Sequence, residues 1–222
     1  MNLAALLSGG KDSMYALYLA GRENKITYIV TITSENPESY MFHVPNVHLV
    51  EEQAKLMGIE IIKKTTKGEK EKELEDLKSV LGTIAGKVDG IVTGAIESNY
   101  QKQRVDKICK ELNLKSLAPL WHKSPEGLLR SMIKDGFEII ITAVAAPPLD
   151  DKWLGRKIDE KCVEELVHLN KKYGIHPSGE GGEYESLVLD CPLFKKKLEV
   201  SESKKIWDEK TRSGHLVVDA VA

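Results

Sequence analysis

The stretch Ser8-Gly9-Gly10-Lys11-Asp12-Ser13 decides the fold of this chain. The apolar run of residues 3–7 precedes it and a helical pattern over residues 14–19 follows it. A strand is therefore expected to end, turn on two glycines and lead into a helix. Glycine lets the backbone approach a ligand closely, and the start of a helix offers unpaired N–H groups and a partial positive charge. With its lysine and two hydroxyl groups, the turn predicts a site for phosphates.

This turn is not a Walker A loop, which has a glycine five positions before its Gly-Lys pair and Ser or Thr after the lysine. Here the pair is Gly10-Lys11, the earlier position is Ala5, and Asp12 follows the lysine. The hexapeptide instead resembles the SGGxDS motif of the PP-loop ATP pyrophosphatases, a family that cleaves ATP between its α and β phosphates. The alternative is an ordinary glycine-rich turn between a strand and a helix.

Length and composition fit one large domain, or a nucleotide-binding domain with a small second one, in a chain of 222 residues. The formal net charge of −2 gives no global basic field, so we expect no direct nucleic-acid partner. Cys109, Cys162 and Cys191 form no CxxC pair, which favours reduced thiols and a cytoplasmic protein. We expect no signal peptide, and the longest apolar run, residues 139–146, is too short to cross a membrane.

Strand and helix signals alternate through the first half of the chain. Strands are expected at residues 26–33, 59–63 and 88–93, and helical spacing appears over residues 47–57, 74–84 and 105–112. Such alternation predicts right-handed βαβ units and a parallel sheet covered on both faces. Ligands of such sheets lie at the carboxyl ends of strands, which is where Ser8 and Thr93 fall.

The second half is less regular. We expect a helix that begins at Pro125 with Ser124 as its N-cap, a strand over residues 137–144, a helix near residues 158–166, and strands over residues 187–189 and 216–221. A soft boundary falls near residues 115–122. The predicted architecture is an α/β chain with a Rossmann-like, parallel-sheet domain over residues 1–118. A smaller α+β domain for substrate binding and catalysis is expected over residues 119–222.

Residues 179–186 read Gly-Glu-Gly-Gly-Glu-Tyr-Glu-Ser, so three carboxylates lie close together among three glycines. Ionised carboxylates repel one another unless a cation or a donor lies between them. If this segment enters a strand, alternation would place Glu183 and Glu185 on one side. The segment is therefore either a site for a metal, ammonium or a substrate, or an exposed acidic hairpin loop.

Four segments together resemble the diphthine–ammonia ligases of the PP-loop ATPase superfamily, in their compact, archaeal-type version. The matching segments are residues 8–13, residues 36–43, residues 93–96 with 100–104, and residues 180–186. The first defines only the superfamily, and its combination with the last points to the ligases. The resemblance implies a PP-loop ATPase domain of the adenine nucleotide alpha hydrolase type.

The resemblance also implies an activity and its partners. These ligases amidate diphthine on translation elongation factor 2 with ammonium, through an acyl-adenylate, and release AMP and pyrophosphate. ATP and Mg²⁺ would then be the cofactors. The alternatives are another PP-loop amide ligase or thiolase, and a non-catalytic ATP-binding regulatory module.

Most individual residues take their expected roles from the matching segments; Ser34 is a further candidate that lies outside them. We expect ATP to be bound by Ser8, Gly9, Gly10, Lys11, Asp12, Ser13, Ser34, Thr93, Gly94 and Ala95. The expected catalytic residues are Lys11, Asp12, Glu183 and Glu185, with Asp12 also a ligand for Mg²⁺. Weaker substrate contacts are expected from Tyr40, His43, Gln101, Arg104 and Glu180. The sequence leaves open whether the glutamates bind ammonium, deprotonate it or hold a metal.

Overall fold

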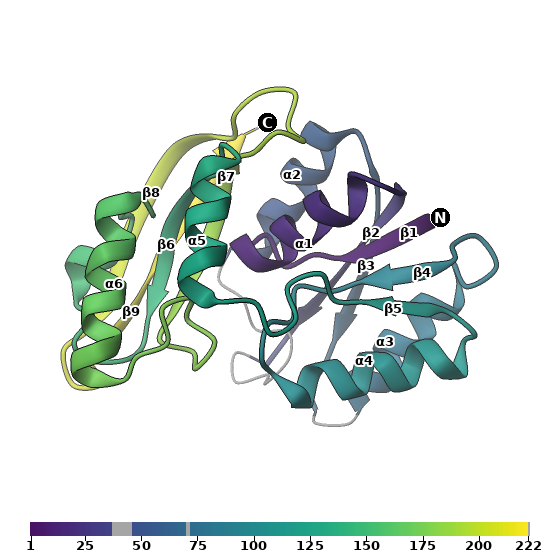
Figure 1. The fold of residues 1–222 in the computed structure, drawn as a ribbon, viewed down its shortest axis with the longest axis horizontal. Coiled ribbons are helices and arrows are strands. Elements are labelled where there is room, and N and C mark those ends of the chain that lie inside the picture. The colour runs from purple at the N-terminus through teal and green to yellow at the C-terminus, as the bar shows by residue number, and fades with distance from the viewer. Residues whose placement is uncertain (37–45, 70–71, 222) are drawn as a thin grey trace.

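The computed structural model describes residues 1–36, 46–69 and 72–221, and it contains two sheets (Figure 1). The first sheet consists of β1 (Asn2–Leu6), β2 (Lys25–Ser34), β3 (Glu60–Thr66), β4 (Gly90–Val92) and β5 (Lys115–Leu117). Its strand order is β3-β2-β1-β4-β5, and every neighbouring pair is parallel. The second sheet consists of β6 (Glu138–Val144), β7 (Tyr184–Asp190), β8 (Glu199–Asp208) and β9 (Ser213–Val221). Its order is β7-β6-β9-β8, and every pair is antiparallel.

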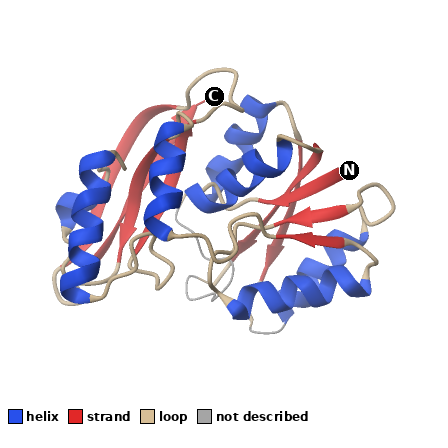
Figure 2. Ribbon diagram, viewed as in Figure 1, coloured by secondary structure: helices blue, strands red, loops and turns tan. Residues whose placement is uncertain are grey.

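Helices cover both faces of the parallel sheet and one face of the antiparallel sheet (Figure 2). On one face of the parallel sheet lie α1 (Lys11–Gly21) and α2 (Val50–Met57), the latter preceded by a 3₁₀ turn at Val47–Leu49. On the other face lie α3 (Lys72–Gly82) and α4 (Asn99–Glu111). The antiparallel sheet carries α5 (Pro125–Lys134) and α6 (Glu160–Tyr173), with a 3₁₀ turn at Asp151–Trp153 between β6 and α6.

The larger of the two apolar cores runs across the boundary between the two sheets. It joins Met14 and Leu17 of α1 to Leu129 of α5 and Ile139 of β6, all fully buried. The smaller core packs α3 and α4 against the other face of the parallel sheet. Because burial of apolar surface is the main favourable term in folding, the shared core fixes the second sheet against the first.

The predicted fold class is confirmed, since a parallel α/β sheet is followed by a smaller α+β unit. The predicted N-cap is confirmed as well, because the Ser124 hydroxyl accepts a hydrogen bond from the N–H of Gly127. Two strands were not predicted. β5 lies inside the segment expected to link the domains, and almost every side chain of β8 is exposed, so neither strand shows an alternating apolar pattern.

The predicted site lies at the point where the strand order of the sheet reverses, between β1 and β4. β1 and β4 are neighbours, and their following segments lead to opposite faces of the sheet. In open α/β sheets the crevice at such a point is where ligands bind. Within the three described ranges, no helix combines the length and the apolar character needed to cross a bilayer.

Candidate active site

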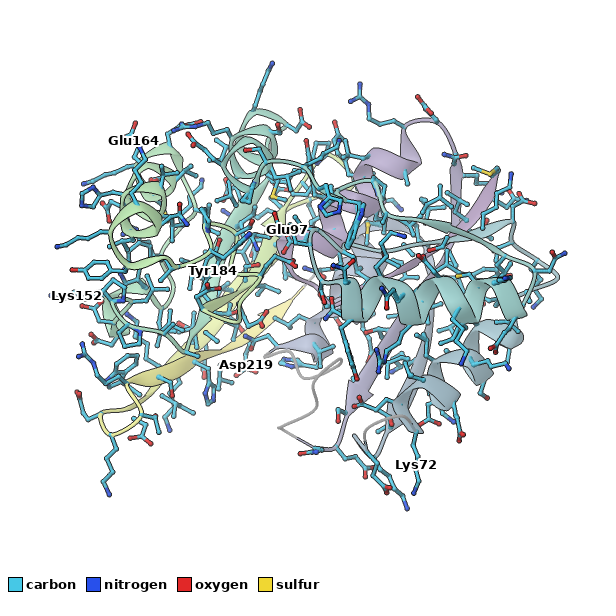
Figure 3. The ribbon with its side chains drawn as sticks, turned by 60° about the horizontal axis from the view of Figure 1, so that its bottom comes forward. Lys72, Glu97, Lys152, Glu164, Tyr184 and Asp219 are labelled. Atoms are coloured by element: carbon cyan, nitrogen blue, oxygen red, sulfur yellow. The ribbon has the colours of Figure 1, made fainter. Side chains whose placement is uncertain are left out.

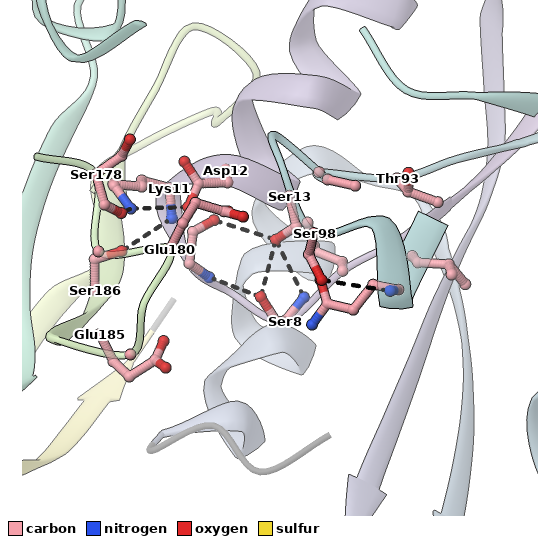
Figure 4. A pocket seen from close by; sticks show the side chains of 18 of the residues that line it. Ser8, Lys11, Asp12, Ser13, Thr93, Ser98, Ser178, Glu180, Glu185 and Ser186 are labelled. Carbon is pink, nitrogen blue, oxygen red and sulfur yellow. Dashed lines mark hydrogen bonds and ion pairs between the residues drawn. The ribbon is translucent and has the colours of Figure 1, made fainter. Parts of the chain in front are cut away.

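A cavity of about 410 Å³ opens at the carboxyl ends of β1, β2 and β4. Much of its polar lining comes from the turn after β1 and the first turn of α1. The rest of this polar wall is residues 178–182 and 184–186, which belong to the second sheet and the loop before it (Figure 4). Its apolar lining comes from strand ends and α4, including Val30, Ile32 and Val105. The cavity therefore lies between the two parts of the chain and is built by both.

The turn after β1 has the conformation that its glycines predicted. Gly9 has a φ of +85°, a region that glycine adopts without steric cost. Ser13 closes the turn, because its hydroxyl accepts from the Ser8 N–H at 3.2 Å and donates to the Gly10 carbonyl at 3.2 Å. α1 begins at Lys11, and the N–H groups of a first helical turn have no partner within their own helix. The turn and the N-terminal end of α1 therefore border the cavity, where a helix start favours an anion.

The segment after β4 packs directly against this turn. A Cβ atom on Gly94 would lie 2.6 Å from the backbone nitrogen of Ser13, closer than real contacts allow. Thr93 is buried and its N–H donates to the Leu117 carbonyl, and Ala95 also lines the cavity. The predicted nucleotide-site residues at positions 93–95 thus lie beside the turn at residues 8–13, which we call the phosphate turn after its predicted ligand.

Strand β7 contacts the same turn from the other side. The Lys11 N–H donates to the Ser186 hydroxyl at 3.2 Å, and the Val188 N–H donates to the Gly9 carbonyl at 3.1 Å. Figure 3 shows Tyr184, the first residue of β7, in the central region of the molecule, where Glu97 also lies. The antiparallel unit thus forms part of the wall around the phosphate turn.

Lys11 is the buried cation of the cavity. Its side chain is 3 % exposed, and its ammonium donates to Asp12 Oδ2 at 2.8 Å and to the Ser178 carbonyl at 2.6 Å. The ammonium also lies 5.0 Å from the centre of the Tyr184 ring. Burial alone would lower the pKa of Lys11, but Asp12 and the other acidic groups more than offset it, so the pKa is raised. Lys11 therefore carries its charge at neutral pH.

Glu180 and Glu185 supply carboxylates to the cavity. Burial raises the pKa of Glu185 to about 7, with Lys11 opposing the rise and Asp12 adding to it. No side chain in the described part of the chain is hydrogen-bonded to the Glu185 carboxylate, which leaves it available to a ligand. Glu180 accepts a hydrogen bond from the Glu97 N–H at 3.4 Å, and burial raises its pKa too.

Glu183 has a different environment from the one that strand alternation predicted. β7 begins only at Tyr184, after a turn at Gly182 with a φ of +82°. The Glu183 carboxylate turns back, accepts the N–H groups of His176 at 2.7 Å and Gly181 at 2.9 Å, and is absent from the cavity lining. The alternation prediction was wrong because Glu183 precedes the strand, and the side chain holds the loop instead.

His176 completes the hydrogen bonding inside this loop. Its Nδ1 atom accepts from the N–H groups of Ser178 at 3.3 Å and Glu180 at 3.4 Å. Its Nε2 atom lies 3.5 Å from Glu97 Oε2. Since two donors converge on Nδ1, the neutral ring carries its hydrogen on Nε2. The loop that bears Glu180 is therefore fixed by its own side chains.

The remaining predicted residues divide between the cavity wall and its surroundings. Gln101 lines the cavity, whereas Arg104 stacks on the Tyr100 ring at 3.4 Å and Ser34 bonds to the Asn36 backbone at 3.1 Å, outside the lining. Tyr40 and His43 lie outside the described residues. The sequence reading missed Ser178 and assigned no role to Ser186, although both contact Lys11; a backbone carbonyl and a strand hydroxyl leave no distinctive pattern.

A magnesium site was expected at Asp12. Its Oδ1 atom is buried without a hydrogen-bond partner among the described residues, and the side chain lines the cavity. Those residues contain no group of three or more His, Cys, Asp or Glu side chains placed to hold a metal. Mg²⁺ is commonly held by one or two carboxylates together with substrate phosphates, so Asp12 fits such an ion only when a nucleotide is bound.

Comparison with known proteins identifies relatives over nearly the whole chain. Models of the diphthamide synthase N-terminal domain and C-terminal domain match residues 1–116 and 124–220. Diphthine–ammonia ligase of Rattus norvegicus is 40 % identical over 228 residues, which cover 93 % of this chain and 85 % of the rat protein. The Homo sapiens ligase is 39 % identical over 226 residues, which cover 92 % of this chain and 84 % of the human protein.

One solved structure resembles the chain more distantly. A predicted subunit of tRNA methyltransferase from Methanocaldococcus jannaschii superposes with a TM-score of 0.46 at 19 % identity, covering 89 % of this chain and 99 % of that one. This likeness is too distant to support an inference about function.

Proposed function

The chain belongs to the diphthamide synthase (diphthine–ammonia ligase) family, and on this premise we propose that it amidates the carboxylate of diphthine with ammonia at the expense of ATP. The observation that carries the proposal is the junction at Lys11. There the turn at residues 8–13 and strand β7 of the other unit, which carries Glu185, line the same cavity. The protein substrate would be translation elongation factor 2, and the nitrogen donor would be ammonium.

Activation of the substrate carboxylate is the first chemical requirement, because a carboxylate has no good leaving group for ammonia to displace. In the proposed reaction a carboxylate oxygen attacks the α-phosphorus of ATP. The bond from that phosphorus to the bridging oxygen breaks, and pyrophosphate leaves. The product is an acyl-adenylate, whose AMP group leaves readily.

The turn after β1 would hold the two outer phosphates. Its main-chain N–H groups and the N-terminal end of α1 favour anions, and Lys11 adds a full positive charge. Charge builds on pyrophosphate as it leaves, and preorganised donors aimed at such charge typically contribute about 2–4 kcal/mol each to lowering the barrier. Mg²⁺, when bound, would be held by Asp12 and the phosphates and would neutralise further charge.

The nucleoside would occupy the apolar half of the cavity. Val30, Ile32 and Val105 offer apolar walls, and the segment at Thr93, which follows β4, lies beside the phosphate turn. An adenine ring in this half would leave the α-phosphate between the turn and the loop at residues 178–186. That placement exposes the α-phosphorus to a carboxylate entering from the second unit.

Amide formation would occur beside Glu185. Ammonia attacks the carbonyl carbon of the acyl-adenylate, loses a proton, and AMP departs with one oxygen of the original carboxylate. Glu185 suits the role of proton acceptor, because its pKa of about 7 lies near the working pH and its carboxylate has no side-chain partner in the described structure. Glu180 would add negative charge that attracts ammonium, and Glu183 would act by holding the loop.

The test is a product analysis with ATP, Mg²⁺, ammonium and elongation factor 2 that carries diphthine. The proposal expects AMP, pyrophosphate and amidated factor in equal amounts, and no reaction when the diphthine-bearing factor is omitted. Formation of ADP and phosphate would contradict it. Tight ATP binding without turnover on the factor would favour a regulatory role.

A further inference from the structure

We infer that Gln53 is a positioning residue, which fixes the orientation of the Gly9–Gly10 peptide and so holds the phosphate turn in its binding conformation. This inference rests on the proposed function, since it assumes that the turn binds the phosphates of ATP. Gln53 belongs to α2 and lies outside the residues that line the cavity. Its effect on a nucleotide would therefore be exerted through the backbone of the turn.

Gln53 is a fully buried amide at the meeting point of three elements. Its Nε2 atom donates to the Gly9 carbonyl at 3.1 Å and to the Val188 carbonyl at 2.8 Å. The Val188 N–H in turn donates to the Gly9 carbonyl at 3.1 Å. These three hydrogen bonds form a closed ring that joins α2, the phosphate turn and β7.

Because a peptide group is planar, these hydrogen bonds fix the orientation of the Gly9–Gly10 peptide. In a planar trans peptide the carbonyl oxygen and the following N–H point in opposite directions. Two donors, from Gln53 and Val188, hold the Gly9 oxygen inside the protein, so the Gly10 N–H is directed to the opposite side. Gly10 lines the cavity, and its N–H has only a long contact, 3.5 Å, with the Ser8 hydroxyl, so it can still donate to a phosphate.

Two glycines make this peptide the easiest one in the turn to rotate. Gly9 has a φ of +85°, and neither residue has a Cβ atom to restrict the peptide between them. A rotated peptide would present its carbonyl oxygen to the cavity and repel an anion. The paired donors on the Gly9 oxygen therefore supply the restraint that the glycines themselves lack.

Packing alone does not account for an amide at this position. Gln53 Oε1 is buried and has no hydrogen-bond partner among the described residues, which costs free energy. An apolar side chain of similar size would fill the space without that cost. Such a side chain could not donate the two hydrogen bonds that the amide group makes.

The ring also couples the phosphate turn to the carboxylate of the second unit. Ser186 accepts the Lys11 N–H and Val188 bonds to Gly9, so β7 contacts the turn at two points. Glu185 immediately precedes Ser186 on the same strand. Gln53 therefore holds the turn and the strand that bears Glu185 as one hydrogen-bonded unit.

The experiment compares Gln53→Met with Leu56→Met, a control on the same helix that alters a buried apolar residue and removes no hydrogen bond. Dissociation constants for ATP and for adenosine are measured by competition with a fluorescent nucleotide. Adenosine has no phosphates, so the ratio of the two constants isolates the turn. We expect Gln53→Met to raise the dissociation constant for ATP, relative to that for adenosine, by about tenfold. Leu56→Met should leave this ratio unchanged.

Equal weakening of ATP and adenosine by Gln53→Met, or no change in either, would overturn the inference. Thermal unfolding shows whether each variant folds. Gln53→Glu keeps the shape but replaces the donors with oxygen, so it carries the test if the methionine variant does not fold. Loss of folding in both variants would assign Gln53 a structural role and overturn the inference. Failure of the unaltered protein to bind ATP would instead overturn the proposed function.

Discussion

The ammonium group of Lys11 donates a hydrogen bond of 2.6 Å to the carbonyl oxygen of Ser178, although the two residues are 167 positions apart in the sequence. Lys11 belongs to the phosphate turn of the parallel unit, and Ser178 to the loop that bears the acidic residues. The buried ammonium of one unit therefore has partners in both units, Asp12 in its own and the Ser178 carbonyl in the other. Neither unit alone contains the whole site.

Replacement of Lys11 by methionine removes the charge but keeps most of the side-chain volume. We expect release of pyrophosphate to slow by about 10²–10³-fold, because one preorganised donor to the leaving group is lost. A coupled pyrophosphate assay measures the rate, and circular dichroism checks the fold. Lys55→Met, at an exposed lysine of α2 that pairs with Glu52, is the matched control. Unchanged pyrophosphate release in the Lys11 variant would remove Lys11 from the chemistry.

Replacement of Glu185 by glutamine tests the proton acceptor. The pKa of Glu185 is about 7, so its carboxylate is protonated below that pH and ionised above it. We expect the ratio of wild-type to variant amidation rates to rise with pH through about 7 and then level off. The ratio is used because the ammonium–ammonia equilibrium affects both proteins equally and cancels. A ratio independent of pH would exclude Glu185 as the base.

The Glu185→Gln substitution should lower activity but raise the stability of the fold. The pKa of Glu185 is raised from 4.5 to about 7 by folding, so the folded state binds this proton more tightly than the unfolded state. The free energy of unfolding then decreases as the pH rises from about 4.5 to about 7, and the loss persists above pH 7. Glutamine mimics the neutral form, so the variant should gain in melting temperature over the wild type between pH 5 and pH 8. Glu202→Gln, at an exposed position on β8, should show no such gain.

Glu183 is expected to keep the loop at residues 176–182 ordered. Its carboxylate accepts the N–H groups of His176 and Gly181, and hydrogen bonds to a charged acceptor contribute about 1.5–3 kcal/mol each. Glu183→Ala should therefore increase hydrogen exchange across residues 176–182, whereas Glu185→Gln should leave it unchanged. Full protection of the loop in the alanine variant would show that other contacts hold it.

Gly94 tests how closely β4 and α1 approach one another. Alanine at this position would place a Cβ atom 2.6 Å from the Ser13 nitrogen, so the phosphate turn must move. Overpacking of this kind typically costs about 1–3 kcal/mol. We expect Gly94→Ala to weaken ATP binding, as measured by calorimetry, and to lower the melting temperature. Gly86→Ala is the control, since its added carbon would meet no atom of a non-adjacent described residue within 4 Å.

The parallel sheet could be predicted because local signals specify it. Apolar strands alternate with amphipathic helices from residue 3 to residue 112, and the glycine turn marks the switch point. β5 was missed because three residues, two of them exposed, carry no periodic signal. β8 was missed because both of its faces are largely polar, so it does not alternate. The second sheet depends more on pairing between distant segments than on local pattern.

The site could be predicted only in its separate parts. The turn at residues 8–13 and the acidic segment at residues 179–186 were both found, but the contacts between them arise from tertiary packing. Gln53 shows the same limit: it lies three residues after Val50 on the buried face of α2, where helical spacing predicts apolar contact. Its bonds to Gly9 and Val188 are not visible until the two units are packed together.

The central claim is that the turn at residues 8–13 binds the β- and γ-phosphates of ATP and leaves the α-phosphorus accessible to a carboxylate. Diphthine labelled with ¹⁸O in its carboxylate tests it most directly, with mass analysis of the products after one turnover. The account predicts one labelled oxygen in AMP and none in pyrophosphate, because the carboxylate oxygen bonds to the α-phosphorus and departs with AMP. Label in inorganic phosphate, with ADP as the nucleotide product, would contradict it.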